Sequence, residues 1–193
     1  MENKITTRIP TPPQAEGPFY PVTKPRDPDS DLTFIQGKPG KAQGQIIYVT
    51  GRVFNQQGRP VEDAKVEIWQ ANTFGRYIHP NETNPAPLDP NFKGYGVLTT
   101  GTGGNYKFKT VKPAGYRAAA DWVRPPHIHF RVTGKVTSLT TQMYFEGEPL
   151  NEKDSLLSNT ENKEALITRL RPPTKGMEPE ALIAPWDIVL PSA

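Results

Sequence analysis

From Ile46 onward, short runs of apolar and β-branched residues alternate with turns rich in glycine, proline and asparagine. The runs 46–54 (IIYVTGRVF) and 64–70 (AKVEIWQ) flank the polar link NQQGRP, a pattern typical of a β-hairpin. The runs 96–100 (GVLTT) and 105–110 (NYKFKT) flank the turn GTGG and predict a second hairpin in the same way. This part of the chain is therefore expected to be built from strands.

The rest of the chain continues the pattern, with little helix. Three more runs predict strands: 127–132 (HIHFRV), 140–145 (TTQMYF) and 187–190 (DIVL). The segment 159–170, with Asn159 or Thr160 as its N-cap, predicts one short C-terminal helix. The segments 71–93 and 112–122 are expected to be loops. About seven to eight short strands, with turns about every 8–12 residues, predict a mainly β fold, namely a β-sandwich with long loops.

Residues 1–45 differ from the rest of the chain, because they are rich in proline and show no hydrophobic periodicity. They predict an extended N-terminal arm laid over the core. A chain of 193 residues is long enough for one domain that buries a core without disulfides. We therefore expect one β-sandwich domain, residues 46–193, preceded by the arm 1–45.

Composition and charge narrow the classes of function. The chain has no cysteine, which excludes disulfides, iron–sulfur clusters and thiol nucleophiles. Its net charge of +3 comes from 23 basic and 20 acidic residues without a basic cluster, so nothing favours a nucleic-acid partner. The N-terminus MENKITTRIP lacks the apolar segment of a secretory signal, and no apolar run is long enough to span a membrane. We therefore expect a cytoplasmic protein.

The strongest chemical signal is the segment RPPHIHF at residues 124–130. On a strand, His127 and His129 project from one face, while Ile128 and Phe130 project from the other face toward a core. Two imidazoles at this spacing can chelate one metal ion, and neutral imidazole suits zinc, copper, iron and nickel. The competing interpretation is a pair of chance strand histidines that are hydrogen-bonded to their neighbours.

The residues alone leave the other ligands open. Asp121 and Glu146 are the nearest carboxylates, and a carboxylate would indicate a ferrous site with two histidines and one carboxylate. Tyr77 and Tyr116 lie in expected loops that can reach the histidines. A phenol has a pKa of about 10 and binds as phenolate only where a strong Lewis acid such as Fe(III) displaces its proton. Each tyrosine alone is equally consistent with a packed side chain.

Several motifs between about Thr11 and Leu150 occur in a recognisable order: TPPQAEGPFY, GRVFNQQGRPVEDAKVEIWQANTFGRY, APLDPNF, VKPAGY, RPPHIHF and TTQMYFEGEP. Together they resemble the intradiol ring-cleaving dioxygenases, in particular the catalytic subunits of protocatechuate 3,4-dioxygenases. The resemblance implies an enzyme that uses O2 to cleave a catechol-type aromatic of the protocatechuate, catechol or hydroxyquinol class. In the implied reaction the bond between the two hydroxyl-bearing carbons would break, both oxygen atoms of O2 would be incorporated, and the product would be a cis,cis-muconate-type diacid.

The same resemblance implies a non-haem Fe(III) cofactor held by four side chains. Tyr77 and His127 match the equatorial ligands, and Tyr116 and His129 match the axial ligands. A solvent hydroxide is implied in the fifth position. The counterpart of Tyr116 leaves the metal when substrate binds, so Tyr116 is also implied in catalysis.

The resemblance also implies residues that act on the substrate. Arg124 matches an arginine that lies beside the bound ring and stabilises its developing negative charge. Gln142 matches a glutamine of the same pocket. The segment GPFY resembles a border of that pocket, which makes Pro18 and Tyr20 candidates for substrate binding.

The chain departs from the protocatechuate enzymes next to Tyr116. Those enzymes carry a tryptophan shortly after the axial tyrosine, whereas Arg117-Ala118-Ala119 follows here. The departure leaves the identity of the catechol open. Three cations, Arg76, Lys112 and Arg117, are candidates to meet a substrate carboxylate. The resemblance further implies a homo-oligomer or a pairing with a related subunit.

Two other functions fit parts of the sequence. Residues 49–116 also resemble the carboxypeptidase-regulatory and transthyretin-like β-sandwich modules, which bind partners without metal chemistry, but this leaves RPPHIHF unexplained. A zinc hydrolase with His127, His129 and a distant carboxylate would leave both tyrosine motifs unexplained. Colour separates these alternatives, because a ferric ion bound to phenolate absorbs visible light and the other two proteins would be colourless.

Overall fold

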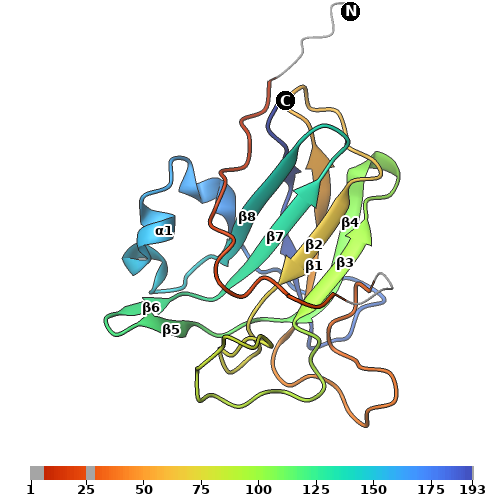
Figure 1. Ribbon diagram of the computed structural model, residues 1–193. Helices are drawn as coiled ribbons and strands as arrows, with labels where there is room; N and C mark the ends of the chain where they lie inside the picture. Colours follow the sequence, from red (N-terminus) through yellow and green to blue (C-terminus); the bar gives the residue numbers. More distant parts are fainter. Residues whose placement is uncertain (1–6, 25–28, 193) are drawn as a thin grey trace, which may run out of the picture.

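Two β-sheets that pack face to face form the body of the protein (Figure 1). The computed structural model describes residues 7–24 and 29–192. The first sheet has four strands: β1 (Ile46–Phe54), β4 (Asn105–Val111), β10 (Leu182–Pro185) and β11 (Ile188–Val189). Strand β1 pairs antiparallel with β4 along one side and parallel with β10 and then β11 along the other.

The second sheet carries the histidine motif. Its five strands are, in spatial order, β3 (Tyr95–Thr99), β2 (Lys65–Trp69), β7 (His127–Thr133), β8 (Ser138–Phe145) and β9 (Ile167–Thr168). A separate two-stranded ribbon consists of β5 (Tyr116–Ala119) and β6 (Trp122–Arg124). Short helical segments complete the described chain: the 3-10 turns η1 (Thr102–Gly104), η2 (Asn151–Lys153) and η3 (Lys163–Leu166), and the helix α1 (Ser155–Ser158).

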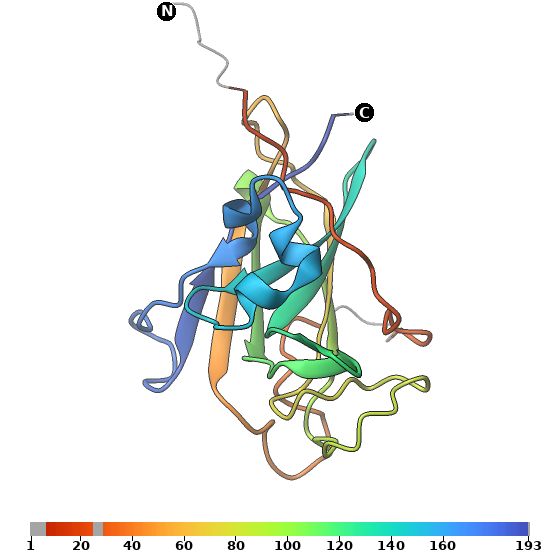
Figure 2. The same cartoon turned by 90° about the vertical axis from the view of Figure 1, so that its left-hand side faces the viewer.

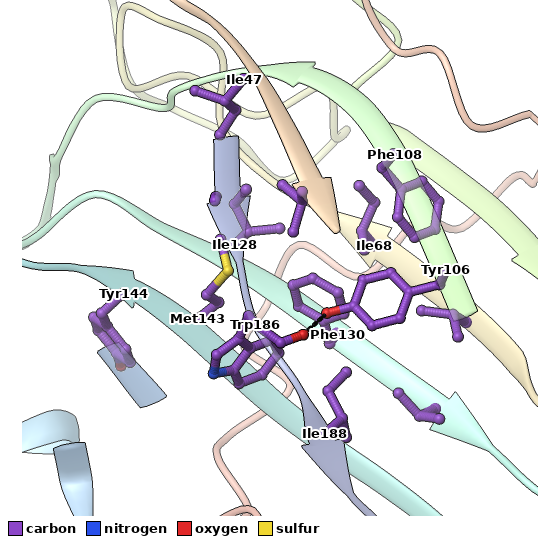
Figure 3. Packing of buried hydrophobic residues seen from close by; sticks show 14 of the residues in the cluster. Ile47, Ile68, Tyr106, Phe108, Ile128, Phe130, Met143, Tyr144, Trp186 and Ile188 are labelled. Atoms are coloured by element: carbon purple, nitrogen blue, oxygen red, sulfur yellow. Dashed lines mark hydrogen bonds between the residues drawn. The ribbon is translucent and has the colours of Figure 1, made fainter. Parts of the chain in front are cut away.

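The space between the two sheets holds the hydrophobic core (Figure 3). Along β7, Ile128, Phe130 and Val132 are fully buried and point into this core, as the alternation of the sequence predicts. The ring of Phe130 lies 4.9 Å from that of Trp186, which belongs to the first sheet and lies between β10 and β11. The predicted β-sandwich with one short helix near the C-terminus is therefore confirmed.

Both predicted hairpins are wrong. The link after β1 begins as a hairpin, since Val61 N donates to Val53 O at 2.8 Å, but the chain then crosses to the second sheet. Strand β2 pairs with β3 and β7, and β4 pairs with β1. Each strand has one apolar face to bury. Two strands that are consecutive in sequence can bury these faces against each other by lying in opposite sheets, so the sandwich separates strands that a hairpin would pair.

The short helix lies earlier in the chain than predicted: α1 spans Ser155–Ser158, and the segment 159–170 contains the 3-10 turn η3 in place of an α-helix. The helix α1 ends before that segment, and Asn159 follows its C-terminus instead of capping a new helix. Asn162 adopts a left-handed conformation (φ 56°), and Ile167 and Thr168 pair with the end of β8. Strand pairing with an existing sheet edge overrides the local helix preference. The segment 112–122, expected to be a loop, contains β5 and the first residue of β6, so the structure has more short strands than predicted.

Part of the N-terminal segment, residues 12–17, runs along β7 and β8 on the outer side of the second sheet (Figures 1 and 2). Gln14 N donates to Thr140 O at 2.9 Å, and Thr141 Oγ1 donates to Pro12 O at 2.7 Å. This segment covers the outward-facing side chains of the second sheet, and that is why both histidines are buried there. None of the helices in the described residues is long and apolar enough to cross a membrane.

Candidate metal centre

The two histidines of β7 lie side by side under the N-terminal segment. Their Nε2 atoms are 3.2 Å apart, and each side chain is 2% exposed. His127 Nδ1 lies 2.7 Å from the carbonyl oxygen of Pro125. A carbonyl only accepts, so Nδ1 carries the hydrogen and the lone pair of His127 Nε2 faces His129. This tautomer is the one that a metal ligand needs.

Packing fixes the orientation of the second imidazole. The strand register places Trp69, His129 and Gln142 in a row across β2, β7 and β8. The indole of Trp69 stacks on the His129 ring at 4.9 Å with an interplanar angle of 10°. Gly17 also approaches this ring so closely that an added Cβ would lie 3.3 Å from His129 Cε1. Both contacts restrict the movement of the ring.

Both imidazoles are neutral. Burial, followed by the charge of Arg124, lowers the pKa of His127 well below its usual value and that of His129 to about 3. A neutral imidazole keeps the lone pair that binds a cation.

Two tyrosines from separate segments reach the same place. The Tyr77 hydroxyl, from the loop after β2, lies 3.4 Å from His127 Nε2. The ring of Tyr116, at the start of β5, lies 5.4 Å from the Tyr77 ring and 5.7 Å from the His127 ring. The structure therefore brings together Tyr77, Tyr116, His127 and His129, which are distant in sequence except for the histidine pair.

Asn72 ties the two tyrosine segments to each other. Its Oδ1 accepts hydrogen bonds from the backbone N of Phe74 at 2.9 Å and of Arg76 at 3.0 Å, which shapes the turn before Tyr77. Its carbonyl accepts from Ala114 N at 3.2 Å, two residues before Tyr116. One asparagine thus sets the backbone on both sides of the tyrosine pair.

Gly75 is the point of closest approach between these segments, and replacing it by alanine should separate them. Gly75 has a φ of +80°, and an added Cβ would lie 2.5 Å from Gly115 O. We expect Gly75→Ala to cost about 1–3 kcal/mol of unfolding free energy more than Gly37→Ala. Gly37 is the matched control, because its φ is +83° and nothing lies within 4 Å. Denaturant titration measures both, and equal losses would contradict the close contact.

The four side chains fit a ferric ion. Burial raises the pKa of both tyrosines, that of Tyr77 well above its usual value, so the phenols stay protonated unless a strong Lewis acid is present. Within residues 7–24 and 29–192, no three histidine, aspartate or glutamate side chains gather as a metal site. The phenols of Tyr77 and Tyr116 supply oxygen donors beside the histidines, and as phenolates they would balance most of the charge of Fe(III).

Arg124, at the end of β6, is buried beside the histidines with 4% exposure. Its Nη1 lies 3.3 Å from His127 Nε2. Its Nη2 donates to Gln142 Oε1 at 2.8 Å and to the Tyr144 hydroxyl at 2.8 Å. Burial disfavours the charge of Arg124, but the hydrogen bond with Asp154 and the electrostatic interactions with Tyr144, Asp154 and Tyr116 together outweigh burial and raise the pKa of the guanidinium. A fixed cation therefore borders the four-residue cluster.

Gln142 has no exposed surface and lies behind Arg124. Its Nε2 donates to Ala15 O at 2.7 Å, and its Oε1 accepts from Arg124 and from Tyr144.

Asp154 is a residue of the site that the sequence did not predict. It forms an ion pair of 2.9 Å with Arg124, which lies 30 positions earlier in the chain. No local pattern marks that pairing.

A cavity of about 470 Å³ opens beside the cluster. Tyr116 and Arg124 form part of its wall, and Pro18 lies on the side that belongs to the N-terminal segment. Tyr20 lies outside this cavity, where its hydroxyl donates to Glu67 Oε1 at 3.1 Å and its ring packs on Trp69. The cavity can accommodate an aromatic ring with substituents next to Tyr116.

Of the three cations considered for a substrate carboxylate, only Arg117 lines the cavity. Lys112 pairs with Glu148 at 2.5 Å, and Arg76 donates to Ala86 O at 2.8 Å. Arg117 donates to Ala120 O and has no carboxylate partner among the described residues.

Comparison with known proteins shows which family the chain resembles. A family model described as "Dioxygenase" matches residues 15–192. The chain is 43% identical over 169 residues to the protocatechuate 3,4-dioxygenase beta chain of Burkholderia cepacia, covering 84% of this chain and 71% of that protein. It is 32% identical over 154 residues to catechol 1,2-dioxygenase 2 of Acinetobacter lwoffii, covering 72% of this chain and 52%, about half, of that protein.

A solved structure gives the same result. The dioxygenase domain of a dioxygenase and carbohydrate-binding fusion protein from Streptomyces sp. SirexAA-E superposes with a TM-score of 0.68 at 28% identity. The match covers 96% of this chain and all of that one. With a family model that spans nearly the whole chain and a relative at 43% identity, the sequence belongs to the intradiol ring-cleaving dioxygenase family.

Proposed function

We propose that this protein is an Fe(III)-dependent intradiol dioxygenase that cleaves a catechol-type aromatic with O2. The observation that carries the proposal is the meeting of two phenols and two neutral imidazoles beside a cavity that also contains a buried arginine. Tyr77, Tyr116, His127 and His129 would hold the ion. When bound, Fe(III) supplies a Lewis acid and a template that bring the diol and O2 together.

The two tyrosines are proposed to differ in role. Tyr116 lines the cavity, whereas Tyr77 lies 3% exposed behind it and does not line the cavity. The substrate therefore reaches Tyr116, whose phenolate oxygen can accept a proton from a catechol hydroxyl, as a general base does. Tyr77 would stay in place throughout.

Arg124 and its neighbours are proposed to act on the bound ring. The guanidinium is fixed by hydrogen bonds before substrate arrives, so it can stabilise negative charge on the ring without reorganisation. Gln142 would hold Arg124 and the N-terminal segment in place, since its polar atoms bond to protein groups. Pro18 would pack against the substrate. Tyr20 has no proposed contact with the substrate, because it lies outside the cavity.

Arg117 is proposed to bind an anionic substituent of the substrate. We expect Arg117→Gln to raise the KM for protocatechuate about tenfold, a loss of about 1.4 kcal/mol, and to leave the KM for unsubstituted catechol unchanged. Lys112→Gln is the matched control, since Lys112 is a cation of the preceding segment that pairs with Glu148 outside the cavity. Steady-state O2 uptake measures both constants. Equal changes for the two substrates would contradict the assignment.

The assembly is proposed to contain more than one chain. The Burkholderia cepacia relative is named a beta chain. This supports self-association or a pairing with a related subunit. Light scattering on the purified protein measures the number of chains.

The alternative is a β-sandwich binding module without metal chemistry, and one experiment separates the two functions. Purified protein is analysed for iron, for visible absorption and for O2 uptake with protocatechuate, catechol and hydroxyquinol, and the product is identified. Iron, colour and a muconate-type diacid are expected. A colourless protein that cannot be loaded with iron would contradict the proposal. Cleavage of the ring at any bond other than the one between the two hydroxyl-bearing carbons would also contradict it.

A further inference from the structure

Asp154 is a buried carboxylate that the proposed chemistry does not use. It has no exposed surface, and its two oxygens accept three hydrogen bonds. Arg124 donates through Nε to Oδ1 at 3.2 Å and through Nη2 to Oδ2 at 2.9 Å, and Trp122 Nε1 donates to Oδ1 at 3.1 Å. The two-pronged contact fixes the plane of the guanidinium as well as its position.

The backbone of Asp154 is held independently of this contact. Its carbonyl accepts from Ser158 N at 2.8 Å in the first turn of α1. The preceding turn is tied to the end of β8, because Asn151 Nδ2 donates to Phe145 O at 2.8 Å. Leu157 on α1 is 1% exposed and belongs to the main cluster of buried hydrophobic residues. The carboxylate therefore extends from a fixed platform.

Asp154 occupies a helix-capping position, but its side chain does not cap the helix. Asp154 is the N-cap residue of α1, and aspartate there normally accepts a hydrogen bond from the first turn of its own helix. Its side chain makes no such bond. The carboxylate is turned instead toward Arg124 and Trp122, both of which line the cavity. A side chain needed only for the helix would not be oriented this way.

The contact between Asp154 and Arg124 does not use Nη1 of the guanidinium, which faces the metal ligands. Nε and Nη2 bond to Asp154, and Nη2 also bonds to Gln142 and Tyr144, while Nη1 is the group directed at His127. Without Asp154, Arg124 would be held only by the hydrogen bonds that it donates to neutral acceptors. The side chain could then rotate about its long stem, because the two-pronged carboxylate contact that fixes the plane of the guanidinium would be lost.

We propose that Asp154 is a positioning residue, which holds the guanidinium of Arg124 in its orientation beside the metal ligands and, through Trp122, fixes the β6 wall of the cavity. The proposal rests on the proposed function, because positioning is expected to show in turnover. It assigns part of the catalytic geometry to α1, a segment that contributes no metal ligand.

The test compares two buried aspartates in the full chain. Asp154→Asn keeps the shape and removes the charge. Asp89→Asn is the matched control, since Asp89 is 3% exposed and accepts from Gln43 N and Asn91 N away from the cavity. We expect Asp154→Asn to lower kcat by about 10- to 100-fold, with the KM within about threefold and the visible absorption of the iron retained. Asp89→Asn should lower thermal stability and leave kcat unchanged.

A second measurement needs neither iron nor activity. In ¹⁵N-labelled metal-free protein, the Nε–H of Arg124 should give a resolved signal that exchanges slowly with solvent, because it is buried against Asp154. We expect Asp154→Asn to accelerate that exchange at least about tenfold, with no change in Asp89→Asn. If Asp154→Asn does not fold, Asp154→Glu keeps the charge but displaces the guanidinium, and kcat should fall about tenfold with colour retained.

The outcomes separate the two proposals. An unchanged kcat together with an unchanged Arg124 signal in the Asp154 variant would overturn the positioning role, leaving Asp154 a structural residue. If the wild-type protein takes up no O2 with any catechol, the proposed function fails, and the Arg124 signal alone then decides whether Asp154 orients the guanidinium.

Discussion

Replacing Tyr77 by phenylalanine should produce a folded protein that retains little Fe(III), lacks visible absorption and turns over catechols more than about 10³-fold more slowly. The hydroxyl of Tyr77 lies 3.4 Å from His127 Nε2, and the ring is buried. The substitution removes one of two oxygen donors that can become anionic, and the imidazoles that remain are neutral. Because the ring stays, the unfolding free energy of the metal-free protein should change by no more than about 1 kcal/mol.

Tyr95→Phe provides the comparison for this experiment. Tyr95 is also a buried tyrosine, but its hydroxyl donates to Glu67 Oε1 at 2.7 Å, whereas the hydroxyl of Tyr77 lies 3.4 Å from His127 Nε2. We expect Tyr95→Phe to keep iron, colour and turnover. Iron per chain and the absorption spectrum are measured on both variants after identical loading. A Tyr77→Phe protein with full iron content and wild-type absorption would show that Tyr77 is not a ligand.

Replacing Arg124 by alanine should slow turnover by about 10² to 10³ while iron stays bound. The guanidinium is a preorganised donor in a buried site, and removing one such donor costs about 2.7–4 kcal/mol of transition-state stabilisation in other enzymes. The four proposed ligands are unchanged by the substitution, so colour should persist. Stopped-flow mixing with substrate and O2 separates the chemical step from product release. A variant with nearly normal turnover would refute the role of Arg124.

The same substitution should also destabilise the fold, and a double variant separates the two effects. Arg124→Ala leaves the carboxylate of Asp154 buried without its cation, which costs about 3–5 kcal/mol when a buried pair is broken. The double variant Arg124→Ala with Asp154→Asn removes the stranded charge. We expect it to recover part of the stability and none of the rate. Recovery of the rate together with the stability would mean that the single variant was slow only because it was poorly folded.

Much of the strand content could be predicted from local pattern. The runs that became β1, β2, β3, β4, β7 and β8 were identified from their apolar and β-branched residues. The pairing of those strands was not predictable from the same information, because a hairpin and a crossover between two sheets place identical demands on the residues of each strand. The helix expected over 159–170 failed for a related reason: Ile167 and Thr168 complete an edge of the sheet, and that edge lies outside the local sequence.

The sequence by itself determined that His127 and His129 share one face of a strand, since side chains on a strand alternate with a period of two residues. Its motifs, read through their resemblance to a family, also indicated Tyr77, Tyr116, Arg124 and Gln142. Only the tertiary structure decided that the N-terminal segment buries the histidines and that Tyr20 lies outside the cavity. It also decided that Asp154 meets Arg124. The reason is physical: a face follows from backbone geometry within a few residues, whereas these contacts depend on how distant segments pack.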